Sequence, residues 1–450
     1  MHKNAPSTHQ KLTKHSDVVR VSTNHWRTVF LGCLLSNTLI IPSAVSQDVA
    51  GVKVNEETLS QVGPPVAGRY EPLTDQIFPT SYHHLSDELS FAKYYNWKRK
   101  LSADHGFDFW ILNSPIAQVG STDGQTYLDN ELDIFFNWRL LDNEDTVGKF
   151  FFWGLYVQTF TDKPSGAFAA SQGLFTFPNG GATDPDKHVI APSALWWEQT
   201  FNNVGLTYRL GQLYAPSLWG TNSYLGDDRA TFMNTALSNP QGTPWSGGSR
   251  GLGAMASVGN DTVYAAAGFQ DAKGDQSSID FESFADGQFS YLGELGWTPT
   301  FGEGLNGTYK ATAGYVGKTG NSGAVSDTDG WGLVISAEQD LTDRFSVFGV
   351  FRKSWGKIIN NTEMTAAGGI MVNGPFNFSD DQIGFGGFFA KPYDTQNGTL
   401  QDEFGLEAFW RFQLTPRLDF TPDAQLYIQP GRVSEESPVG VFGLRARYVL

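Results

Sequence analysis

Apolar and polar residues alternate with a period of two along most of the chain after Gly106. The clearest run is 417–429, where apolar residues hold the even positions: Leu418, Phe420, Pro422, Ala424, Leu426 and Ile428. Successive side chains of a β-strand point to opposite faces, so this pattern predicts a strand with one face suited to hydrocarbon and one suited to water. Residues 402–413 and 129–140 repeat it, with Trp138, Trp410 and Phe412 on the apolar faces.

The same pattern predicts sixteen strands. We place them at 107–116, 129–140, 149–161, 193–201, 203–213, 251–258, 262–270, 288–299, 306–318, 329–340, 344–355, 364–373, 380–390, 402–413, 417–428 and 438–449. Short connections alternate with long ones, and the longest runs from Tyr214 to Arg250. Transmembrane barrels of outer membranes are built with an even number of strands, tight periplasmic turns and longer outer loops. We therefore expect an all-β fold, a sixteen-stranded antiparallel transmembrane β-barrel with a short N-terminal periplasmic helix.

The first hundred residues lack this pattern. Residues 1–46 are typical of a signal peptide, with scattered Lys and Arg, an apolar stretch at 28–41 and small residues at 44–46. A lipoprotein site at Cys33 is the alternative, but most of the apolar stretch follows Cys33 instead of preceding it. We expect 47–106 to form a periplasmic arm with a short helix over 86–101, and 107–450 to form the barrel.

Composition narrows the class. Charged residues make up 17% of the chain, aromatic residues 14%, and there are 50 glycines; soluble domains carry about 25% charged residues. The net charge of −16 argues against nucleic acid as a partner. The single cysteine excludes a disulfide framework. We expect no cofactor and no metal site, because Asp327 and Asp329 lack the distal glutamate of a calcium loop and His83-His84 lack further ligands.

Several segments carry a recognisable pattern in a fixed order: WKRKL at 97–101, HGF at 105–107, YRLGQ at 208–212, GDDRATFMN at 226–234, FQLTP at 412–416, PDAQ at 422–425, QPG at 429–431 and FGLR at 442–445. Together these segments resemble the carbohydrate-selective porins of Gram-negative outer membranes. The resemblance covers about residues 95–450 and implies a sixteen-stranded barrel of the outer membrane that passes carbohydrate solutes passively. It also implies contact with outer-membrane lipid and the barrel-insertion machinery, as a monomer or homotrimer. One departure is the C-terminal residue, Leu450, where family members usually have phenylalanine.

Sugar recognition in a channel needs aromatic faces and planar charged groups that bind pairs of hydroxyls. We expect the connection from Tyr214 to Arg250 to fold into the barrel and form the constriction. Its candidate residues are Tyr214, Trp219, Asp227, Asp228, Arg229 and Trp245. Candidates on the lumen face of the strands are Arg139, Glu198, Arg209, Arg411 and Arg445. We expect Arg229 and Trp219 to contribute more to sugar passage than Arg447 near the periplasmic end.

Two alternatives remain open for these residues and for the chain. The connection could be a solvated outer loop with interfacial tryptophans, and the lumen charges could line a wet channel without selecting a solute. The chain could also be a general or ion-selective porin, or a secreted carbohydrate-active enzyme. We assign no catalytic residue.

Overall fold

A computed structural model of the 450-residue chain provides the structure. It describes residues 88–122, 124–180, 189–226, 228–238, 250–274, 278–302, 304–317, 329–356, 362–378, 380–393, 400–415, 417–432 and 438–450. All of them belong to one unit, Gln61–Leu450. The expected signal peptide and the arm up to residue 87 lie outside the described residues.

A helix, α2, over Glu88–His105 precedes the strands. The first eight strands are β1 Phe107–Gly120, β2 Thr126–Asp142, β3 Thr146–Thr159, β4 Val189–Phe201, β5 Leu206–Tyr214, β6 Arg250–Gly259, β7 Val263–Asp271 and β8 Phe289–Trp297. The others are β9 Thr300–Phe301, β10 Leu305–Val316, β11 Gly330–Asp340, β12 Phe345–Gly356, β13 Thr362–Asn373, β14 Gln382–Pro392, β15 Glu403–Gln413, β16 Leu418–Gln429 and β17 Val439–Val449.

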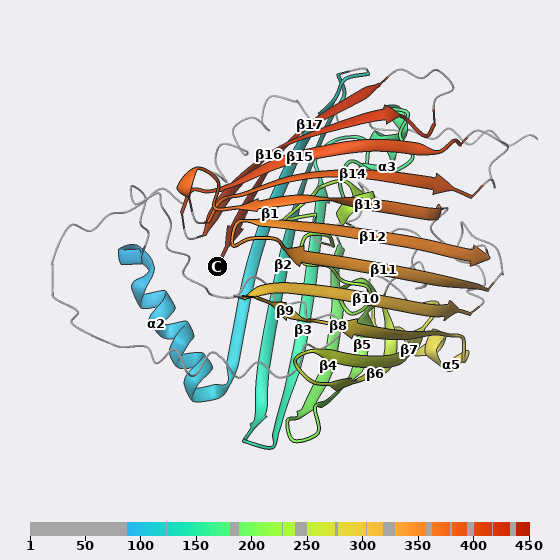
Figure 1. The fold of residues 1–450 in the computed structure, drawn as a ribbon. Coiled ribbons are helices and arrows are strands. Elements are labelled where there is room, and N and C mark those ends of the chain that lie inside the picture. Colours follow the sequence, from blue (N-terminus) through green and yellow to red (C-terminus); the bar gives the residue numbers. More distant parts are fainter. Residues whose placement is uncertain are drawn as a thin grey trace, which may run out of the picture. The chain divides into compact units, whose positions relative to one another are not determined.

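The strands close into a ring. Each long strand pairs antiparallel with its sequence neighbours, and β1 pairs with both β2 and β17. The two-residue β9 pairs with β10 alone, beside the β8–β10 pairing (Figure 1). The result is a closed sixteen-stranded antiparallel barrel, which confirms the expected fold class. The expected strand 288–299 corresponds to β8, which ends at Trp297, and the two-residue β9, which follows Pro299, was not expected.

The period-two pattern correctly predicts which side chains face inward. In β16, Tyr427 is fully buried, whereas Leu426 and Ile428 on either side of it are 44% and 43% exposed. Trp138 and Trp410 are also exposed, as expected for the outward apolar face. Polar side chains therefore line the inside of the barrel and apolar side chains cover its outside.

The connections at the two ends of the barrel differ in length. The turns 143–145, 202–205, 260–262 and 341–344 lie at one end, and the connections 160–188, 215–249 and 272–288 lie at the other. An exception to the expected alternation is 357–361, which is shorter than 374–381 at the opposite end. Short helices occur in these connections: α3 Ser165–Ser171, η3 Ala215–Ser217, α4 Thr235–Ser238, α5 Phe281–Ala285 and η4 Pro375–Asn377.

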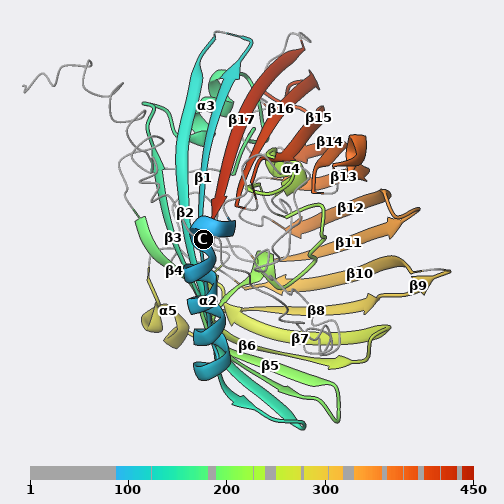
Figure 2. The same cartoon turned by 90° about the vertical axis from the view of Figure 1, so that its left-hand side faces the viewer.

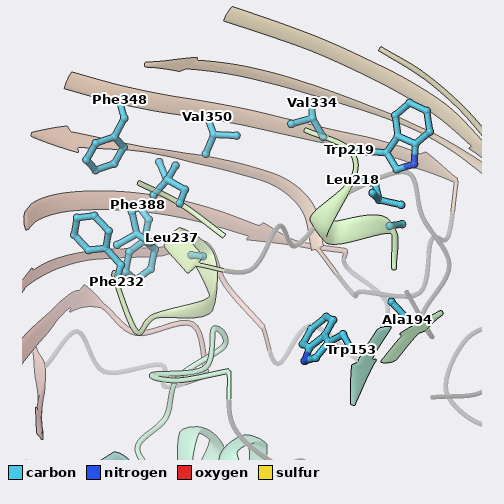
Figure 3. Packing of buried hydrophobic residues seen from close by; sticks show 14 of the residues in the cluster. Trp153, Ala194, Leu218, Trp219, Phe232, Leu237, Val334, Phe348, Val350 and Phe388 are labelled. Carbon is cyan, nitrogen blue, oxygen red and sulfur yellow. The ribbon is translucent and has the colours of Figure 1, made fainter. Parts of the chain in front are cut away.

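Buried apolar side chains form a cluster between the barrel wall and the connection that follows β5. Figure 3 shows Leu218 and Trp219 of this connection beside Val334 of β11. Helix α4 of the same connection packs against β13 and β14 (Figure 2). Among the described residues, none of the helices is long and apolar enough to cross a bilayer.

Candidate functional site

The connection that follows β5 lies inside the barrel, where inward glutamates of three strands accept its backbone N–H groups. Glu294 of β8 accepts from Gly220 at 2.6 Å, and Glu338 of β11 accepts from Ser223 at 2.8 Å. Glu407 of β15 accepts from Met233 and from Asn234. A segment that leaves the strands must find new partners for its backbone groups, and the wall provides them.

Inward arginines hold the same segment through its carbonyl groups. Arg352 of β12 donates to the Ala236 carbonyl at 3.1 Å, and Arg411 of β15 donates to the Ala230 carbonyl at 3.2 Å. Arg445 of β17 donates to the carbonyls of Asp228 and Thr231. Acids therefore bind the N–H groups and bases bind the carbonyls, which fixes the course of residues 215–238. We call these residues the inserted loop.

Apolar side chains attach the inserted loop at two further places. Trp219 is 1% exposed and lies near Val334 of β11. Phe232 packs edge-on against Phe409 of β15, with ring centroids 4.9 Å apart, and also contacts Phe348 of β12. Gly386 of β14 leaves room for this packing, because a Cβ there would lie 3.0 Å from the Phe232 ring.

Arg229 is the charged anchor of the inserted loop. Its guanidinium donates to both oxygens of Asp129, at 3.1 and 2.9 Å, and to Glu131 at 3.1 Å, while Asp228 lies 3.4 Å away. Burial alone would lower the pKa of Arg229, but the three carboxylates raise that pKa well above its usual value. Arg229 therefore stays charged and binds the loop to β2.

A second connection, residues 160–180, meets the inserted loop. Glu403 of β15 accepts from the backbone N–H groups of Phe175 and Thr176 at 2.7 and 2.8 Å. Phe177 then exchanges hydrogen bonds with Thr235 of the inserted loop, at 3.0 and 2.9 Å. Two connections therefore enter the barrel together, whereas only the connection from Tyr214 to Arg250 was expected to do so.

Aromatic rings, acids and a guanidinium meet where the inserted loop begins. The guanidinium carbon of Arg250 lies 4.9 Å from the Tyr214 ring centre and 5.9 Å from that of Trp153. Trp153 packs edge-on against Tyr214 and donates its indole N–H to Asp133 at 2.6 Å. Glu131 and Asp228 lie beside Arg229. We call these two acids, together with Trp153, Tyr214, Asp133 and Arg250, the Tyr214 cluster.

A second charged group lies on β3, β4 and β5. Glu198 binds Arg209 at 2.6 Å and Lys149 at 3.1 Å. The Arg209 guanidinium lies 5.8 Å from the ring centre of Trp196, which stacks on Phe151 with centroids 4.3 Å apart. Aromatic rings and ion pairs are therefore found on β3, β4 and β5 as well as in the Tyr214 cluster.

Exposure separates the candidate residues into two groups. Asp228 keeps 22% of its side chain exposed and Arg139 36%, and Tyr214 and Arg411 are half-buried. The remaining described candidates are almost fully buried: Glu198, Arg209, Trp219, Arg229 and Arg445. Asp227 and Trp245 lie outside the described residues. The first group therefore keeps accessible side-chain surface, and the second group is enclosed by its partners in the barrel.

Trp153, Arg250 as a site residue and the connection 160–180 were not predicted from the sequence. Trp153 could have been found, because it shares the inward positions of its strand with Lys149 and Phe151. Asp329 of the rejected calcium loop accepts a hydrogen bond from the Tyr315 hydroxyl at 2.7 Å, and Asp327 is not described. The described residues contain no group of three or more His, Cys, Asp or Glu that could hold a metal ion.

A sixteen-stranded barrel narrowed by an inserted loop, with charged groups inside and apolar residues outside, defines an outer-membrane porin. The sequence model of the carbohydrate-selective porin, OprB family, matches residues 182–450. The chain belongs to this family. Membership indicates a channel of the Gram-negative outer membrane.

Known relatives agree with this assignment. The chain is 28% identical to Porin AaxA of Chlamydia abortus over 274 residues, which cover 60% of this chain and 59% of that protein. Porin AaxA of Chlamydia felis is 28% identical over 273 residues, 60% of each chain. The match thus spans about three fifths of these relatives. The high-pH structure of Pseudomonas putida OprB aligns with a TM-score of 0.66 and 15% identity, covering 80% of this chain and 97% of that one.

Proposed function

We propose that the chain lets small carbohydrates diffuse passively into the periplasm and that the Tyr214 cluster is where they are recognised. The observation that carries this proposal is the meeting of rings, carboxylates and a guanidinium inside the narrowed barrel. Aromatic faces stack on the apolar faces of sugar rings, and planar charged groups bind adjacent hydroxyls in pairs. Such groups discriminate where the passage is narrow enough to displace water from the solute.

Within this proposal, the exposed and the buried candidates have different roles. Tyr214 and Asp228 contact the solute, because their side chains retain accessible surface. Arg229 and Trp219 act indirectly by holding the inserted loop. Arg139 and Arg411 provide further polar contacts along the lumen.

Liposome swelling tests the proposal against a general or ion-selective porin. The full chain is reconstituted and exposed to sugars, amino acids and salts of matched size. A sugar channel admits sugars faster than other neutral solutes of the same mass, and a sugar added to a planar bilayer blocks its ion current. Swelling rates that follow mass alone, with no block by any sugar, would contradict the proposal and favour a general porin.

The proposal also treats the chain as a channel without catalytic activity. Purified protein incubated with oligosaccharides is expected to leave them intact. Hydrolysis that disappears when a single acid is substituted would instead support the carbohydrate-active enzyme.

A further inference from the structure

Three charged side chains interrupt the apolar outer face of the barrel at one place. They are Lys353 of β12, Glu363 of β13 and Lys391 of β14, on three neighbouring strands. Elsewhere the charged residues of the strands largely follow the inward positions, as the arginines and glutamates of the lumen do. We call these three residues the outer-face cluster.

The orientation of Lys353 follows from its neighbours in β12. Arg352 and Ser354 are buried in the lumen, at 2% and 1% exposure. Phe351 and Trp355 lie two residues before and two residues after Lys353, and both are exposed on the outer face. Because successive side chains of a strand alternate between faces, Lys353 projects outward toward lipid.

Lys391 projects outward for the same reason, and Glu363 lies between the two lysines. Ala390, next to Lys391, is fully buried, and Phe385 on the same face as Lys391 is exposed. The pairing of β13 with β14 shifts register between Thr362 and Met364, and Glu363 is the residue at this irregularity. One Glu363 oxygen binds the Lys353 ammonium and the other lies 3.2 Å from the Lys391 ammonium. The carboxylate holds the two lysines together and leaves the cluster with one excess positive charge.

The outer-face cluster lies near the end of the barrel from which the longest connection emerges. β12 ends at Gly356 and β14 ends at Pro392, the same end at which β5 ends and the inserted loop begins. The longer loops of such barrels face the cell exterior. Exposed rings of Trp331 and Trp355, paired across β11 and β12, lie on the same face at this level. Aromatic girdles of this kind mark the boundary between hydrocarbon and headgroups.

We propose that the outer-face cluster binds the phosphate of a phosphorylated glycolipid in the outer leaflet of the membrane. Two ammonium groups on neighbouring strands can donate to one phosphate, and their long apolar stems let them reach toward the headgroup layer. The lipid's acyl chains would lie along the apolar wall formed by residues such as Phe351 and Phe385. The chain as a whole carries a net negative charge, so this outward patch differs from the rest of the protein in its excess positive charge.

A lipid fits this surface better than free phosphate does, because the lysines are only partly exposed and are surrounded by apolar side chains. Side-chain exposure is 21% for Lys353 and 43% for Lys391. A ligand with both a phosphate and hydrocarbon chains satisfies the charges and the apolar wall together. The binding does not depend on which solute passes through the lumen.

Binding of bis-phosphorylated lipid A to the full chain in detergent tests the proposal by native mass spectrometry. Removing one lysine, in Lys391→Gln, is expected to weaken binding about fivefold, and removing both, in Lys353→Gln with Lys391→Gln, about thirtyfold. Lys273→Gln is the matched control, because Lys273 also pairs with an acid, Asp286 at 2.9 Å, but lies in the connection after β7. This control is expected to bind like the original chain. Heat-modifiable gel mobility establishes that each variant is folded.

Three outcomes would overturn the proposal. One is a folded double variant that binds lipid A within twofold of the original chain. Another is equal binding of dephosphorylated lipid A, which would show that the acyl chains alone are recognised, or equal binding of inorganic phosphate. The third is a change in oligomeric mass without a change in lipid affinity, which would identify a contact between copies of the chain. If the double variant does not fold, the fivefold effect expected for Lys391→Gln decides.

Discussion

Arg229 faces three carboxylates, so its removal leaves their charges uncompensated inside the barrel. Breaking a buried pair in this way costs about 3–5 kcal/mol. We expect Arg229→Ala to lower the stability of the barrel by an amount of this order and to loosen the inserted loop. Ion conductance in planar bilayers should then rise, and block by sugars should weaken.

The control for Arg229 removes an ion pair without leaving a charge behind. Arg447 binds Asp419 at 2.8 Å near the periplasmic end, away from the inserted loop. The double variant Arg447→Gln with Asp419→Asn is expected to leave conductance and sugar block nearly unchanged. If folded Arg229→Ala barrels match the original chain in both measurements, Arg229 does not hold the constriction.

A Tyr214 variant tests whether the Tyr214 cluster contacts the sugar directly. Its ring packs against Trp153 beside the Arg250 guanidinium, and its loss removes a stacking surface worth about 0.5–1.5 kcal/mol. We expect Tyr214→Ala to weaken sugar block of the current about two- to tenfold. Tyr208→Ala is the matched control, because Tyr208 lies on the same strand at an outward position beside the exposed Leu210. Equal effects of the two substitutions would show that Tyr214 does not contact the sugar.

The sequence predicts inward strand residues better than it predicts the roles of loop residues. Period two correctly places Glu198, Arg209 and Arg445 inside the barrel, because alternation is a local property of a strand. Arg229 and Trp219 lie in a segment without a period, and their partners in β2 and β11 are distant in sequence. Burial of these two side chains depends on those distant contacts, so no local pattern could reveal it.

At the scale of elements, Glu403 joins the connection 160–180 to the barrel wall. It accepts backbone N–H groups from Phe175 and Thr176, and also from Gly431 at 2.9 Å. Glu403→Gln replaces one acceptor oxygen with an N–H₂ donor that faces other donors. We expect a loss of about 1.5–3 kcal/mol for each bond to the charged group that is broken, seen as a lower temperature in heat-modifiable gel mobility.

Single-channel recordings distinguish a local effect of Glu403→Gln from general instability. Because residue 177 of this connection bonds to Thr235, the variant should also show larger fluctuations of the open current. Glu144→Gln is the control, since Glu144 lies exposed in the turn between β2 and β3. Unchanged unfolding temperature and current noise in Glu403→Gln would mean that this glutamate does not hold the connection.

Element boundaries depend on signals of different strength. The ends of the long alternating strands were predicted within a few residues, but β9 was not predicted, because two residues are too few to show an alternating pattern. Helix α2 continues to His105, past the expected end of the helix at residue 101. Gly106, with φ of 64°, adopts the left-handed conformation that ends many helices. Its amide donates to the Ser102 carbonyl at 2.8 Å, so this glycine was the better signal.

At the scale of the whole molecule, the arrangement of charge predicts how the channel treats ions. Near Tyr214 and Arg229, four carboxylates face two guanidiniums: Asp129, Glu131, Asp133 and Asp228 against Arg229 and Arg250. The chain as a whole carries a net charge of −16. A negative potential at a narrow point raises the local concentration of cations and lowers that of anions. We therefore expect the open channel to conduct K⁺ in preference to Cl⁻.

The zero-current potential across a bilayer with a KCl gradient measures this preference. Its sign should correspond to cation selectivity, and the selectivity should fall as ionic strength rises, since the Debye length shortens from about 10 Å at 0.1 M to about 3 Å at 1 M. Uncharged sugars experience no such screening, so their swelling rates should stay constant over the same range of salt. Anion selectivity, or a potential near zero at low salt, would show that the acids around Tyr214 do not set the field along the ion path.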